Sequence, residues 1–186
     1  MGEQGIGSVG GARGFGERLL GALKLDASVF EEVEHDEGAL RQAAAVVALG
    51  GGAHALGTAA DLGLGGLVGG MIGGLLGWLV STAFVWLVGV RLMHHTSDYV
   101  ELLRTLGFAS VPLFLLALGV VPLGPLAPVL LIAVFGLNLA AYVVAVRQAL
   151  DVETPRALLV CVLAIAVNVL VALLLVGLMG LLIAPR

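Results

Sequence analysis

The sequence predicts an all-α, polytopic membrane protein: a five-helix transmembrane bundle with short cytoplasmic amphipathic helices. The composition is 60% hydrophobic and 12% charged, with a mean hydropathy of +1.10. The chain contains five long apolar runs, and a helix of roughly 20 apolar residues crosses a bilayer core about 30 Å thick. Apart from Arg186, every Lys and Arg lies before the first run, between the second and third, or between the fourth and fifth. This alternation is the positive-inside pattern and predicts a cytoplasmic amino terminus and a carboxyl terminus outside the cell.

The segment before the first apolar run divides into a tail and a head. Residues 1–14 are Gly-rich and typical of disorder. Residues 15–41 are predicted to form a cytoplasmic head of two amphipathic helices, the first lying either on the membrane surface or against the protein's own spans. Asp26 and Ser28 should cap the second helix, and Asp36 the helix of the first span. The chain has a net charge of −4, all of which arises from residues 1–41. An acidic head argues against nucleic acid and favours a protein partner.

Residues 42–186 are predicted to form the membrane domain. Its five spans are expected at residues 43–60, 65–90, 106–123, 126–146 and 157–184. Pro112 interrupts the third span and further prolines crowd the turn to the fourth, so these two could cross fully or form a shallow re-entrant hairpin. Asp98 and Glu101 have the spacing of a capping box and predict an interfacial helix that leads into the third span.

The second span carries the most specific packing signal, a glycine ladder at Gly65, Gly69, Gly73 and Gly77, with Gly66, Gly70 and Gly74 beside it. Small residues repeated every four positions form a groove through which membrane helices approach closely. We therefore predict tight helix contact along the ladder. A partner helix in the same chain is favoured over one in another copy.

Polar residues inside the predicted spans include His54, Ser81, Thr82, Asn138 and Asn168, with Asp61 at the outer end of the first span, and His54 and the two Asn residues are the candidates for a function. Polar groups there are costly unless paired, so each invites a functional interpretation. They could line a permeation path, or they could form the interhelical hydrogen bonds that hold a bundle together. The second interpretation is preferred, because only His54 is ionisable.

Signals for chemistry are weak. No Ser, Cys or carboxylate has a visible triad or dyad partner, and the lone Cys161 lies inside the last span. His94, His95 and Asp98 could be imagined as a metal site, but surface residues at a helix start are the preferred interpretation. We expect no catalysis, no cofactor and no bound metal.

Three stretches together resemble one family: VFEEVEHD at residues 29–36, GWLVSTAFVWLVG at residues 77–89, and YVELLRTLGFASVP at residues 99–112. They are similar to prokaryotic members of the Yip-domain family. The resemblance implies a cytoplasmic amino-terminal region, five spans and almost no tail. Eukaryotic relatives bind prenylated Rab-type GTPases and act in vesicle trafficking. The DLYGP-type signature of that branch has no match here, so GTPase binding is not expected.

Two functional hypotheses follow. The first is a non-enzymatic protein of the bacterial inner membrane that organises or scaffolds membrane components, as a homo-oligomer or an accessory subunit. Its partners would be membrane lipids and other membrane proteins or further copies of itself. The second is a small transporter, channel or lipid-moving protein that uses the intramembrane polar residues. The residues expected to contact partners in the cytoplasm are Phe30, Glu31, Glu32, Asp36, Tyr99, Glu101 and Arg104.

Overall fold

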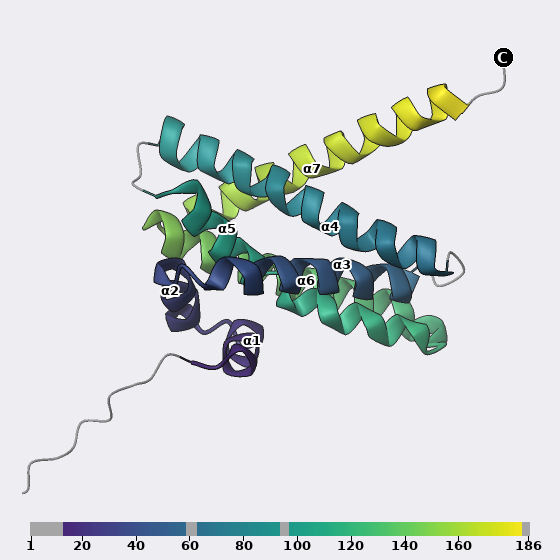
Figure 1. Cartoon of the computed structure of the whole chain (residues 1–186), viewed down its shortest axis with the longest axis horizontal. Coiled ribbons are helices and arrows are strands. Elements are labelled where there is room, and N and C mark those ends of the chain that lie inside the picture. The colour runs from purple at the N-terminus through teal and green to yellow at the C-terminus, as the bar shows by residue number, and fades with distance from the viewer. Residues whose placement is uncertain (1–12, 59–62, 94–96, 184–186) are drawn as a thin grey trace, which may run out of the picture.

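The computed structural model describes residues 13–58, 63–93 and 97–183 of the chain. Every regular element in these ranges is a helix, which confirms the all-α class (Figure 1). The elements are α1 (Phe15–Leu23), α2 (Ala27–His35), α3 (Ala39–Thr58), α4 (Gly63–Trp86), the π-helix η2 (Leu87–Leu92), α5 (Tyr99–Phe108), the 3₁₀ helices η3 (Val111–Val120) and η4 (Gly124–Leu126), α6 (Ala127–Leu150) and α7 (Thr154–Ile183).

Four segments of the described chain are long and apolar enough to cross a membrane: Gly63–Arg91, Tyr99–Val120, Gly124–Leu150 and Thr154–Leu174. The first span expected at residues 43–60 is not among them, so the five-helix count is not met on this criterion. The reason lies in the composition of α3, which is largely Ala and Gly and includes Gln42 and His54. Short side chains give this helix little hydrophobic surface.

α3 nevertheless belongs to the bundle. It packs along α4 and along η3, and Figure 1 shows it running beside α4, while Leu49 and Leu56 leave part of the helix exposed. Glycines bring its backbone against α4: a Cβ on Gly70 would lie 2.6 Å from the carbonyl oxygen of Gly51, and one on Gly74 would lie 3.2 Å from Gly51 Cα. No larger residue fits there without moving a backbone.

The expected third span begins earlier than residue 106. The main-chain amide of Asp98 donates to Glu101 Oε2 at 2.8 Å, and the amide of Tyr99 donates to Asp98 Oδ1 at 2.7 Å, so the predicted capping box is confirmed. α5 then leads into η3, and Pro112 lies in the first turn of η3, where its missing amide costs little. The segment Tyr99–Val120 lies in the interior of the bundle. In its most apolar stretch 61% of the residues are buried, against 22% in each of the other three membrane-spanning segments.

The head folds onto the end of the bundle. Both expected caps are present: the amide of Ser28 donates to Asp26 Oδ1 at 3.0 Å, and the amide of Gly38 donates to Asp36 Oδ1 at 2.8 Å. Val29, Phe30 and Val33 of α2 are buried in the core. α1 packs against the protein's own helices, the second of the two expected arrangements, and the ring of Phe15 meets that of Phe108 edge to face at 6.3 Å.

Candidate functional site

The charged residues of the structure gather at one end of the bundle, on the left in Figure 1. We call it the charged end and define it by residues 13–41, 91–93, 97–104 and 147–156. Every Asp, Glu, Lys and Arg within the described ranges belongs to it. The alternating charge pattern of the sequence is thus collected on a single face of the fold.

Arg18 is the centre of the charged end and only 3% exposed. Its guanidinium lies 2.6 Å from Asp36 Oδ2 and 2.9 Å from Glu32 Oε1, and it also donates to Gln42 Oε1 at 3.1 Å. The hydrogen bond from Arg18 is the main reason that the pKa of Asp36 is lowered. Because the four residues belong to α1, α2, α3 and the turn before α3, this network fixes the head to the bundle.

Several residues expected to contact partners are instead structural. Phe30 is fully buried, which corrects its assignment to a contact surface. Arg104 is 8% exposed, and its Nη2 donates a hydrogen bond to the carbonyl oxygen of Glu34 at 2.5 Å. Glu101 caps α5, and the Tyr99 hydroxyl donates to the carbonyl oxygen of Leu79 at 3.2 Å. Of the seven, Glu31 alone has an exposed side chain that joins none of the hydrogen bonds or ion pairs between described residues.

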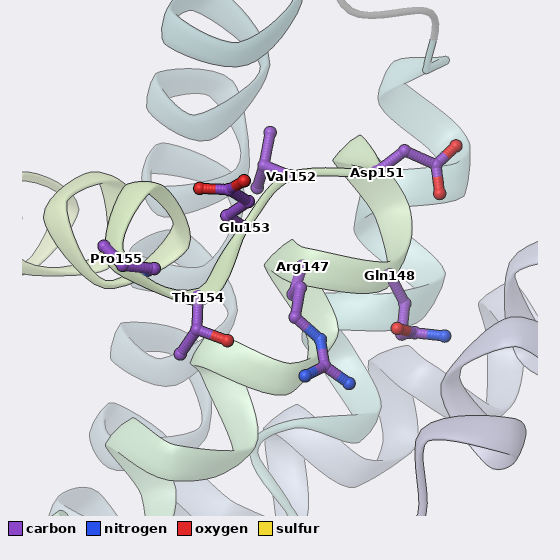
Figure 2. A pocket seen from close by; sticks show the side chains of 7 residues that line it. All are labelled: Arg147, Gln148, Asp151, Val152, Glu153, Thr154 and Pro155. Atoms are coloured by element: carbon purple, nitrogen blue, oxygen red, sulfur yellow. The ribbon is translucent and has the colours of Figure 1, made fainter.

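A shallow depression at the α6–α7 turn also belongs to the charged end (Figure 2). In Figure 2, Arg147 and Gln148 point to one side of the turn, while Asp151 and Glu153 point away from them and from each other. Asp151 has a φ of 50° and terminates α6 in the left-handed conformation. These side chains do not converge on a common point, so they do not form a shared binding centre.

A larger cavity of about 880 Å³ lies between α3, α4, η3, α6 and α7. We call it the interhelical cavity. Its wall is mainly apolar and contains no Asp, Glu, Lys or Arg. His54, Asn138 and Asn168, which the sequence marked separately, all line it.

The polar groups of the interhelical cavity differ in how they are satisfied. Asn168 Nδ2 donates to Ser81 Oγ at 2.5 Å and to the carbonyl oxygen of Ala164 at 3.0 Å, which joins α7 to α4. Asn138 Oδ1 is buried and has no hydrogen-bond partner among the described residues. His54 is exposed, and its ring meets the Phe135 ring edge to face at 6.1 Å. The interhelical hydrogen bond expected of these residues is therefore found at Asn168 and not at Asn138.

The glycine ladder faces this cavity and open space. Within the described residues nothing lies within 4 Å of a Cβ built on Gly65, Gly69 or Gly73, and Gly77 meets only Asn168 Oδ1 at 3.6 Å. Gly73 and Gly77 line the cavity. The expected close contact inside the chain is made by Gly70 and Gly74 on an adjacent face of α4, so the assignment of that contact to the ladder is corrected.

The chain matches the Yip1 domain over residues 27–176. It belongs to the Yip1 domain family. The resemblance inferred from the sequence is thereby confirmed, and together with the four apolar segments it identifies a multi-pass membrane protein. The match runs from the first residue of α2 into α7 and so includes most of the charged end and the interhelical cavity. No curated protein and no solved structure matches the chain significantly.

The remaining sequence predictions for this Yip1 domain concern metal binding and the tail. No group of three His, Cys, Asp or Glu residues in the described part of the chain could hold a metal ion. His94 and His95 lie outside the described residues, as do residues 1–12 of the expected tail.

Sequence reasoning missed three further residues of the Yip1-domain cavity: Trp78, Ser110 and Tyr142. Trp78 Nε1 donates to the carbonyl oxygen of Leu103 at 3.1 Å, and the hydroxyl groups of Ser110 and Tyr142 lie 3.4 Å apart. In a sequence, an aromatic residue within an apolar run cannot be distinguished from an ordinary core or interface residue. The only available signal was the recurrence of hydroxyl groups in otherwise apolar helices.

Proposed function

We propose that this protein is a non-enzymatic organiser of membrane components in the bacterial inner membrane, with the charged end as its docking surface for a protein partner. The observation that carries the proposal is the Arg18 network, which holds α1 and α2 as a fixed platform on the bundle. A platform that is already ordered presents its surface to a partner without an entropic cost of folding.

The proposed topology places the charged end in the cytoplasm and the carboxyl terminus outside. It requires α3 to cross the bilayer as a fifth span. Support comes from the packing of α3 along α4, and from Figure 1, where the two helices run side by side in opposite directions. A helix sheltered by apolar neighbours needs less hydrophobic surface of its own than one that faces lipid.

The chemistry of the platform favours a basic partner surface. Glu31 and Glu37 are exposed at either side of the α2 C-terminus, and no ion pair between described residues uses them. Glu32 and Asp36, by contrast, are engaged by Arg18. The head therefore uses Glu32 and Asp36 in the Arg18 network and presents Glu31 and Glu37 to solvent, where they can steer and select a positively charged surface.

Charge reversal at the two exposed acids tests the proposal. The variant Glu31→Lys with Glu37→Lys should fold and insert as the wild type does, but lose a partner that copurifies stoichiometrically from native membranes in mild detergent. Glu153→Lys is the matched control, because it reverses an exposed acid at the charged end outside the head. A wild-type chain that runs as a monomer with no stoichiometric partner would refute the proposal, as would undiminished partner recovery with the double variant.

A further inference from the structure

The interhelical cavity has the size and wall of a ligand site rather than of a packing defect. Its volume of about 880 Å³ lies within the range of roughly 300 to 1,000 Å³ that small-molecule pockets occupy. It is bounded by five helical elements of the membrane domain. A void of this size left empty would forfeit the dispersion contacts of its whole lining, so an occupant is expected from the surrounding medium.

Glycines of α4 and α6 keep the cavity open. Gly73 and Gly77 of α4 and Gly136 of α6 all line it, and nothing lies within 4 Å of a Cβ built on Gly73 or Gly136. Side chains at these positions would extend into the space. Two helices therefore contribute bare backbone to the wall while neighbouring positions carry larger apolar residues.

The cavity meets the lipid phase between α6 and α7. Phe135 of α6 and Ile165 and Val169 of α7 belong to its lining, yet their exposed fractions are 47%, 50% and 53%. Figure 1 shows α6 and α7 diverging from their shared turn at the charged end. An occupant can enter from the bilayer between these two helices without passing through water.

The polar groups of the wall select the chemistry of the occupant. Asn138 lines the cavity, its Oδ1 has no partner among the described residues, and its carboxamide can both donate and accept. Neither Lys nor Arg lines the cavity to balance a phosphate, and its one histidine, His54, packs against the Phe135 ring, so a charged head group would be costly inside it. A long hydrocarbon chain that carries a hydroxyl or carbonyl group satisfies both the apolar wall and Asn138.

We infer that the interhelical cavity binds a neutral membrane lipid, with a hydrocarbon chain along the Gly73 wall and a hydroxyl or carbonyl group hydrogen-bonded to Asn138. The inference goes beyond the proposed docking function, because it concerns a different face of the molecule and a lipid in place of a protein. The two can therefore fail separately: Glu31→Lys with Glu37→Lys leaves the cavity unchanged.

Trp78 provides the reporter for the test, since it lines the cavity and is only 6% exposed. Trp86→Phe leaves Trp78 as the single tryptophan of the full-length chain. In detergent, dioleoylglycerol brominated on its acyl chains should quench Trp78 fluorescence in a saturable manner, and unlabelled dioleoylglycerol should reverse the quenching. Brominated phosphatidylglycerol, which carries a charged head group, should quench at least tenfold less at equal concentration.

Two variants separate the wall from the polar group. Gly73→Leu fills the cavity and should reduce the apparent affinity for dioleoylglycerol at least tenfold. Asn138→Leu keeps the bulk but removes the amide and should reduce it about threefold to tenfold, the range of one hydrogen bond between membrane groups. Gly65→Leu is the matched control on α4, because it makes the same change in open space outside the cavity and should bind as the wild type does.

Three results would overturn the inference. One is quenching that does not saturate or that does not distinguish the two lipids. Another is unchanged affinity in Gly73→Leu when circular dichroism and gel filtration show a folded variant. The third is a disulfide-linked dimer formed by Gly73→Cys in native membranes, which would place a helix of a second copy in the cavity in place of a lipid.

Discussion

The two glycine-bearing faces of α4 have the same residue type at the same spacing but different contacts, although Gly70 and Gly74 also border the interhelical cavity. On one face Gly70 and Gly74 bring the helix against the backbone of α3 at Gly51. On the adjacent face Gly65, Gly69 and Gly73 meet nothing within 4 Å among the described residues, and Gly73 lines the interhelical cavity. Glycine thus allows close contact on the first face, which we call the seam, and leaves free space on the second.

The difference shows that a small-residue repeat predicts where side chains are missing along a helix face. It does not predict what lies against that face. Glycines every four residues form a shallow groove, and whether a helix, a lipid or another chain fills it depends on the neighbouring elements. Substitutions on the two faces should therefore differ in their effect on stability.

The largest effect is expected at the seam. A Cβ on Gly74 would lie 3.2 Å from Gly51 Cα and 3.2 Å from the carbonyl oxygen of Val47, both of which are backbone atoms. Gly74→Leu must therefore push α3 and α4 apart and should cost about 3 kcal/mol, the upper part of the usual range for overpacking. Thermal unfolding in detergent, followed by circular dichroism, measures the loss.

Gly74→Ala provides a graded control for the seam and should lose less stability than Gly74→Leu. If Gly74→Leu melted at the wild-type temperature, the seam would not be a tight contact. The distinction between the two faces would then disappear.

A smaller loss of stability is expected from removing the hydrogen bond that joins α7 to α4. Asn168 Nδ2 donates to Ser81 Oγ at 2.5 Å, a direct side-chain bond from α7 to α4. Asn168→Leu should destabilise the protein by about 1 kcal/mol, because hydrogen bonds between membrane helices are worth roughly 0.6 to 1.7 kcal/mol. A double-mutant cycle with Ser81→Ala isolates the pair, and energies that simply add would show that the bond does not stabilise the fold.

The charged end depends on neither glycine face, and acid should affect it alone. The hydrogen bond from Arg18, aided by the Gly38 amide, lowers the pKa of Asp36 from its ordinary value of 3.8. Because the pKa of Asp36 is lower in the folded state, its carboxylate stabilises the fold at pH values above 3.8. This stabilisation is lost as the pH falls through the pKa that Asp36 has in the folded state. The protection of α1 and α2 against hydrogen exchange should therefore fall as the pH drops through the folded pKa of Asp36, while α3 and α4 stay protected.

Asp36→Asn is the control for acid release. It should accelerate exchange in the head at neutral pH and weaken its pH dependence. Acid-induced exchange that appeared equally in the head and the seam would show that the Arg18 network does not act as a separate unit.

The sequence predicted the elements that depend on local physics and missed those that depend on neighbours. The caps at Asp26, Asp36 and Asp98 were predictable because capping needs only residues a few positions apart. Phe30 was misassigned to a surface because an isolated amphipathic helix does not show what covers it. The first span illustrates the same limit, since α3 packs along α4 and η3 although it is not among the segments apolar enough to cross a membrane.

For the same reason, the sequence predicted individual residues of the candidate site but not that they share a cavity. His54, Asn138 and Asn168 could be identified one by one because polar residues in apolar runs are conspicuous. That they share a cavity depends on the way five helical elements pack, which no spacing along the chain encodes. The glycine ladder was recognised as a groove, but its contents could not be inferred from the ladder itself.

The smallest change in stability is expected on the open face, and it is the most informative. Gly73→Leu adds a side chain where nothing lies within 4 Å of the new Cβ. It also replaces a poor helix former, and an exposed Gly in a helix interior costs up to about 1 kcal/mol relative to better formers. The variant should therefore unfold at or slightly above the wild-type temperature, in contrast to its neighbour Gly74→Leu. Equal destabilisation by both variants would mean that a helix occupies the open face, and the contrast between the two faces of α4 would be wrong.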